Sequence, residues 1–168
     1  MYYRVVAQST QNLKQVQAWL DAAENHARTK RFDISVLLSA RLAPDMKPFT
    51  YQVQSASDYI KAAAAWLSGR TPPRYLDTEQ TVAEVRARID KTVAFVEGIT
   101  EGEFASAPER KVSLSWEPGK VIGGPDYLVQ VTIPNVYFHL TTAYAILRHN
   151  GVEIGKMDFL GRLNMVDS

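Results

Sequence analysis

Residues 126–150 read DYLVQVTIPNVYFHLTTAYAILRHN, a segment in which apolar side chains occupy most faces of the helix that it predicts. We therefore expect this helix to be the most buried one of the fold. Pro134 has no backbone N–H, so either one helix kinks there or two helices meet. Asn150-Gly151 is typical of a helix end, because glycine accepts the left-handed backbone conformation there.

Three more helices are predicted upstream by apolar residues at steps of three, four and seven. The middle one opens after Pro48, which suits the first turn of a helix. The third begins with Thr81 and Glu84, a spacing that predicts a capping box. The three expected helices cover residues 8–29, 48–69 and 81–98, and a short helical turn is expected at 35–40.

The periodicity changes between the third helix and the last. Val112, Leu114 and Trp116 alternate with polar residues, which is typical of a half-buried strand. Residues 117–120 read EPGK and predict a type II turn, and residues 121–122 would form a short returning strand. The chain thus predicts an all-α protein, a four-helix bundle with short connections and one longer crossover that carries a small β-hairpin between helices three and four.

Length and composition limit the class of protein. The 168 residues favour one domain over 1–168, and 19 basic against 18 acidic residues leave no patch suited to nucleic acid. The chain has no cysteine, so disulfides, thiolate metal sites and cysteine nucleophiles are excluded. No apolar run is long enough for a membrane span or a secretory signal, and we expect a cytoplasmic protein.

Asn135 and His139 mark a candidate site on the last helix. Side chains four residues apart share one helical face, with Cβ atoms roughly 5–6 Å apart. Two polar groups are therefore aimed at one point from a helix that is otherwise largely apolar. His139 is the candidate catalytic residue, because an imidazole with an ordinary pKa of about 6.5 can act as base or donor.

The end of this helix carries a resemblance to a known family. Residues 147–151, LRHNG, followed by Asp158, are similar to the ending of the fourth helix in the DinB/YfiT-like superfamily. In that superfamily one histidine on the second helix and an H-x-x-x-H pair on the fourth bind a divalent metal. The resemblance implies that His139 stands at the second histidine of the pair, Asn135 at the first and Gln52 at the histidine of the second helix.

A narrower resemblance covers nearly the whole chain. Five parts of the chain are similar to an uncharacterised bacterial branch, the domain-of-unknown-function family nineteen-ninety-three. They are residues 41–46, Gln52, and residues 134–139, 144–151 and 155–158. Some members of the superfamily are metal-dependent, thiol-linked transferases or isomerases. The resemblance therefore implies a DinB-like bundle with a pocket that acts on a small molecule.

The metal-ligand set implied for this chain is His139, Asn135 and Gln52, with nickel or zinc as the expected ion. Amide oxygens are neutral and weak donors to transition metals, so this set favours a site without metal. Two readings then stay open. The residues form either a buried polar cluster that satisfies its own hydrogen bonds, or a metal-free pocket that binds or transforms a small molecule.

Other side chains are expected around this pocket or at an interface. His26, near the end of the first helix, would approach Gln52 at the start of the second, and the Tyr144 hydroxyl would donate into the same pocket. Exposed aromatic residues would suit a homodimer interface, and the candidates are Trp19, Trp66 and Tyr75.

Two hypotheses about function follow. The first is a metal-dependent, thiol-linked, transferase-like enzyme that acts on a small molecule. The alternative is a non-catalytic protein without bound metal, either a ligand-binding protein or a homodimeric scaffold. The sequence leaves open whether the chain is an enzyme, and nucleic acid and membrane are not expected partners.

Overall fold

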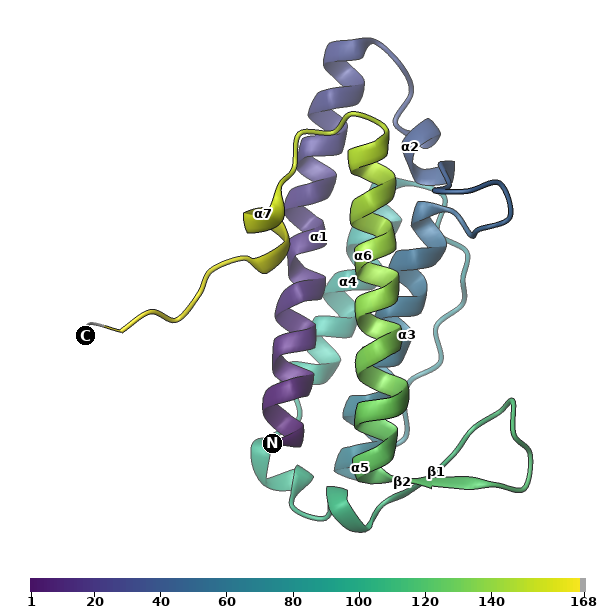
Figure 1. Cartoon of the computed structure of the whole chain (residues 1–168), viewed down its shortest axis with the longest axis vertical. Coiled ribbons are helices and arrows are strands. Elements are labelled where there is room, and N and C mark those ends of the chain that lie inside the picture. The colour runs from purple at the N-terminus through teal and green to yellow at the C-terminus, as the bar shows by residue number, and fades with distance from the viewer. Residues whose placement is uncertain (167–168) are drawn as a thin grey trace.

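The computed structural model describes residues 1–166, and four long helices form its bundle (Figure 1). They are α1 (Tyr2–Lys30), α3 (Phe49–Ser68), α4 (Val82–Glu97) and α6 (Ile133–His149). The predicted all-α four-helix bundle with a small hairpin insert is confirmed. The last two residues of the predicted C-terminal tail lie outside the described residues.

The directions of the helices explain the longest connection. Figure 1 shows α1 and α6 running one way and α3 and α4 running the other. Two ion pairs show that α1 and α4 are antiparallel. The earlier residue of α1, Lys14, pairs with Glu97 at the end of α4, and the later one, Glu24, pairs with Arg86 near its start. Because α3 and α4 are parallel, the segment 69–81 must return along the whole bundle, whereas we expected a short connection here.

A buried arginine fastens this crossover segment to the bundle. The Arg88 side chain is 1% exposed and contacts the carboxylates of Asp58 at 2.9 Å, Asp77 at 2.9 Å and Glu79 at 3.0 Å. Glu79 also accepts a hydrogen bond from Gln54 of α3 at 2.8 Å. The four charged groups therefore join α3, α4 and the crossover segment. Carboxylates contact both terminal nitrogens of the buried guanidinium, whereas its Nε has no hydrogen-bond partner among the described residues.

The first helix begins earlier than predicted. It starts at Tyr2 rather than near Gln8, and Val6 is already buried in the core. The ring of Tyr3 meets that of Phe104 edge-on, with centroids 5.8 Å apart. This packing stabilises the first turn of α1, because no side chain caps the N-terminus of that helix.

The C-terminal segment packs on α1. The short helix α7 (Lys156–Leu160) places Phe159 against the ring of Trp19, with centroids 5.7 Å apart, and the Trp19 Nε1–H donates to the Asp158 carbonyl at 3.0 Å. Trp19 is fully buried as a result. Its predicted exposure was wrong, so it is no candidate for a subunit interface.

The predicted hairpin is present, but its first strand is shorter than the sequence pattern predicted. Strand β1 (Lys111–Ser113) pairs antiparallel with β2 (Val121–Gly123), and Val112 lies opposite Ile122. Gly119 has φ of +83° and the Lys120 N–H donates to the Glu117 carbonyl at 3.2 Å, which confirms the turn. Strand pairing stops at Ser113, so Trp116 lies in the loop rather than in a strand.

Short elements complete the chain: α2 (Ser35–Ser39), the 3-10 turns η1 (Glu101–Phe104) and η2 (Ala107–Glu109), and α5 (Gly124–Asp126). A π-helical turn, η3 (Tyr127–Thr132), leads directly into α6, with Pro134 at the start of that helix. The predicted capping box of Thr81 and Glu84 is confirmed, with both bonds present. Within residues 1–166, no helix combines the length and the apolar character that crossing a bilayer requires.

Candidate functional site

His139 and Gln52 meet between α6 and α3, as predicted. The Nδ1 atom of His139 lies 2.8 Å from the Oε1 atom of Gln52. The Nε2–H of Gln52 donates to the Lys47 carbonyl at 2.9 Å, which turns the amide oxygen toward the imidazole. An amide oxygen only accepts, so Nδ1 carries the proton. The other ring nitrogen, Nε2, is therefore left with a lone pair.

Aromatic rings surround this imidazole. The ring of Tyr59 stacks on His139 at 5.8 Å with an interplanar angle of 19°, and Tyr51 and Phe138 meet it edge-on at 6.3 Å and 5.2 Å. Burial lowers the pKa of His139 below its ordinary value. Burial, followed by the charge of Tyr51, raises the pKa of Tyr59. At neutral pH the site thus contains a neutral imidazole stacked on the neutral phenol of Tyr59.

Asn135 does not join the pair, although it lies on the same helix. Its Nδ2–H donates to the Val131 carbonyl of the π-helical turn at 2.7 Å. Val131 lies one turn before Asn135, so this bond is a local one from a side chain to the backbone of the same segment. The predicted convergence of Asn135 on His139 is therefore replaced by a local bond to the backbone.

His26 lies at another level of the bundle. Its ring meets Phe32 edge-on at 5.7 Å, and a Cβ added at Gly151 would stand 3.3 Å from its Cε1 atom. Gly151 follows His139 by more than three helical turns, roughly 15 Å or more along the axis. The expected approach of His26 to Gln52 was wrong, because the end of α1 packs beside the end of α6.

Tyr144 also faces away from the site. Its hydroxyl donates to the Ile154 carbonyl at 3.3 Å, and its ring meets Trp19 and Phe159 edge-on at 5.8 Å and 5.9 Å. These partners belong to α1 and the C-terminal segment rather than to α3. The placement of Tyr144 in the pocket was therefore wrong, and its role is to pack the C-terminal segment.

The three residues at the superfamily's metal positions do not form a ligand set. Gln52 Oε1 and His139 Nδ1 are hydrogen-bonded to each other, and the Asn135 amide binds the backbone. Within residues 1–166 there is no group of three or more His, Cys, Asp or Glu side chains arranged to hold an ion. One imidazole nitrogen with neutral amides does not fit a transition metal.

Two residues missed from the sequence link this pair to the surface. Tyr59 lines a pocket of about 290 Å³ beneath the hairpin, and Tyr51 lines an open groove of about 540 Å³ next to Lys47 and Glu79. Tyr59 follows Gln52 by seven residues, so both lie on one face of α3. From that spacing alone, Tyr59 could have been predicted to lie on the same side of α3 as Gln52.

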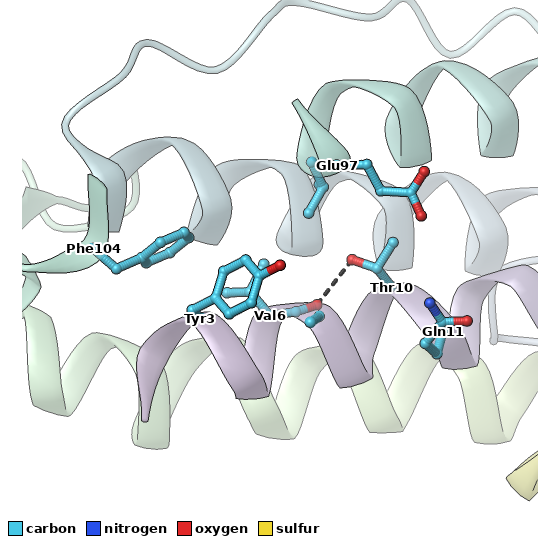
Figure 2. A pocket seen from close by; sticks show the side chains of 8 residues that line it. Tyr3, Val6, Thr10, Gln11, Glu97 and Phe104 are labelled. Atoms are coloured by element: carbon cyan, nitrogen blue, oxygen red, sulfur yellow. Dashed lines mark hydrogen bonds between the residues drawn. The ribbon is translucent and has the colours of Figure 1, made fainter. Parts of the chain in front are cut away.

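Another cavity lies on the opposite face of the bundle, between α1 and α4 (Figure 2). Its volume is about 100 Å³, and Val6 and Phe104 contribute apolar wall. Its polar groups are largely occupied, since Thr10 donates to the Val6 carbonyl and Glu97 pairs with Lys14. Ligand pockets usually exceed about 300 Å³, so this cavity is too small for most ligands.

Comparison with known proteins identifies the family. The model of the family described as Domain of unknown function (DUF1993) matches residues 1–160. The chain belongs to the DUF1993 family. Among solved structures, this DUF1993 chain is similar to a DinB family member protein from Shewanella denitrificans, with 42% identity, a TM-score of 0.94, and coverage of 99% of this chain and 95% of that one. No curated protein matches it. The resemblance to the DinB-like superfamily and to this branch is confirmed.

Proposed function

We propose that this chain binds a small molecule at the α3–α6 face without a resident metal, and that His139 Nε2 is its polar anchor. The observation that supports the proposal is the chain of bonds from the Lys47 carbonyl through the Gln52 amide to His139 Nδ1. These bonds fix the imidazole of His139 in the tautomer with a protonated Nδ1 and leave Nε2 as a hydrogen-bond acceptor.

The chemistry of that acceptor defines the ligand. A neutral Nε2 accepts a hydrogen bond from an O–H, N–H or S–H group. Phenol rings of Tyr51 and Tyr59 offer flat apolar surface beside it. A thiol ligand would agree with the superfamily resemblance. If the ligand reacts, the same nitrogen would take its proton as general base, since the lowered pKa of His139 keeps the imidazole neutral at pH 7.

The tautomer and the metal content are tested together. In ¹⁵N NMR spectra of the imidazole, we expect a protonated Nδ1 and a bare Nε2 in His139. We expect nickel and zinc to raise the melting temperature of the wild type no more than that of His139→Ala. Stoichiometric metal that disappears in His139→Ala would overturn the metal-free site, and a protonated Nε2 would overturn the anchor.

Ligand binding is tested with phenol and anisole, which have the same ring but differ in the O–H donor. We expect phenol to shift the Nε2 resonance of His139 and anisole to leave it nearly unchanged. The control is Phe138→Ala, which removes an exposed neighbour of His139 and keeps the hydrogen-bonded pair. Equal shifts from both probes would show that Nε2 accepts no ligand proton.

A homodimeric scaffold is the second candidate. Large apolar side chains are exposed along α1, η3 and α6, namely Met1, Val129 and Phe138. Such exposure suits a subunit interface better than the buried Trp19. Sedimentation velocity of the wild type and of Val129→Ser tests it. A dimer that weakens in the variant would support a scaffold, and a monomer at all concentrations would exclude it.

A further inference from the structure

The pocket beneath the hairpin, hereafter the hairpin pocket, has an unusual lining. Four aromatic side chains come from three parts of the chain: Tyr59 and Trp66 from α3, Trp116 from the hairpin loop and Tyr127 from η3. Its volume of about 290 Å³ is at the small end of ligand sites. Trp116 is 57% exposed and Trp66 is 38% exposed, so both indoles are within reach of a ligand from solvent.

Among the described residues, the rings of this pocket lack the lysine or arginine that lies over other rings of the protein. The Nζ atoms of Lys61 and Lys91 lie 4.0 Å and 4.2 Å from the centroid of Tyr75, and Lys47 lies 5.4 Å from that of Tyr51. Within residues 1–166, no lysine or arginine lies over a ring of the hairpin pocket. The face of an aromatic ring attracts cations, and indole does so most strongly.

The pocket has one charged lining residue, Asp58. Its Oδ1 atom accepts from Lys61 at 2.7 Å and from Arg88 at 2.9 Å, which holds the carboxylate in place. Arg88 also pairs with Asp77 and Glu79, so its charge is shared among three carboxylates. Oδ2 of Asp58 has no hydrogen-bond donor among the described residues. The pocket therefore has beside its rings a carboxylate that two cations hold through Oδ1, with Oδ2 left to accept a further contact.

We propose that the hairpin pocket binds a small organic cation with a quaternary ammonium head. Such a head has no N–H, so it needs only ring faces and a nearby negative charge, whereas a primary ammonium also needs three acceptors. This proposal does not rest on the role of His139, which is absent from the pocket lining. Tyr59 is the one side chain that belongs to both sites.

Choline and 3,3-dimethylbutan-1-ol test the proposal by isothermal titration calorimetry of the full chain. The two molecules have nearly the same shape, and only choline carries a charge. We expect choline to bind at least about tenfold more tightly than the alcohol, the difference that a cation over ring faces provides. Equal affinities, or no heat from choline, would overturn the proposal.

Three variants locate the site. Trp116→Leu should weaken choline binding by about five- to thirtyfold, because one ring over the cation is removed at an exposed loop position. Val121→Ala is the matched control: Val121 is equally exposed on the same hairpin but does not line the pocket, so affinity should not change. Trp66→Leu should also weaken choline binding, because it removes the other exposed indole of the pocket lining. Unchanged affinity in Trp116→Leu would place the cation elsewhere.

Discussion

Replacing Gln52 by glutamate should reverse the way in which His139 links stability to pH. In the wild type, burial holds the pKa of His139 below its ordinary value. The unfolded chain then binds more protons than the folded one as pH falls below about 6.5, so stability decreases down to the folded pKa. In Gln52→Glu, a carboxylate stands where the amide oxygen now lies, 2.8 Å from Nδ1, and favours the imidazolium.

The size of the effect follows from this contact. An opposite charge at hydrogen-bond distance raises such a pKa by about one to two units where the group is partly exposed, which corresponds to about 1.4–2.7 kcal/mol. The folded pKa of His139 then exceeds the unfolded value. The added stability is fully present below about pH 6.5 and is lost as pH rises through the folded pKa. Burial raises the pKa of the neighbouring Tyr59 phenol, which therefore does not titrate in this range.

Two measurements check the reversal. NMR titration of the His139 ring gives the pKa directly, and urea unfolding at about pH 5.5 and about pH 8.5 gives the stability difference. Gln52→Met is the control, since it also removes the bond to the Lys47 carbonyl but introduces no charge. If His139 titrates at the same pH in Gln52→Glu and in the wild type, the imidazole does not contact residue 52 and the proposed site is wrong.

Three further predictions concern stability, measured by urea unfolding. Arg88→Met should lower the free energy of unfolding by about 3–5 kcal/mol, because it leaves the buried Glu79 carboxylate without its closest charge partner. A double variant with Glu79→Gln should recover part of this loss. Gly124→Ala should cost about 3 kcal/mol, because the new Cβ would stand 2.0 Å from the Ala107 carbonyl oxygen, whereas an alanine at the open position Gly102 should cost far less. Thr81→Ala should cost about 1 kcal/mol through loss of the cap on α4, and an effect near zero would show that the capping box is not needed.

The helices were predictable because their signals are local. Apolar steps, the Thr81 cap and Gly69 as a stop are contained in short windows of sequence, and each agrees with the structure. The direction of α4 relative to α3 was not predictable, since periodicity does not encode it. Arg88 was also missed, although it follows Val85 on the apolar stripe, because an arginine at such a position is usually assigned to solvent.

The candidate site was predictable only in part, for a similar reason. The contact of Gln52 with His139 came from the resemblance to the superfamily and is present. The position of Asn135 depends on the π-helical turn, a deviation that helical spacing alone cannot reveal. His26 and Tyr144 were placed by assumed neighbours, whereas the structure places His26 beside Gly151 and the Tyr144 hydroxyl at the Ile154 carbonyl.

The contact between Trp19 and α7 bears on how the protein matures during synthesis. During synthesis α1 is made well before residues 156–160, and the indole is covered only when both have emerged. Until then the nascent chain carries an uncovered tryptophan on its first helix. This part of the interior therefore closes only after residues 156–160 have left the ribosome.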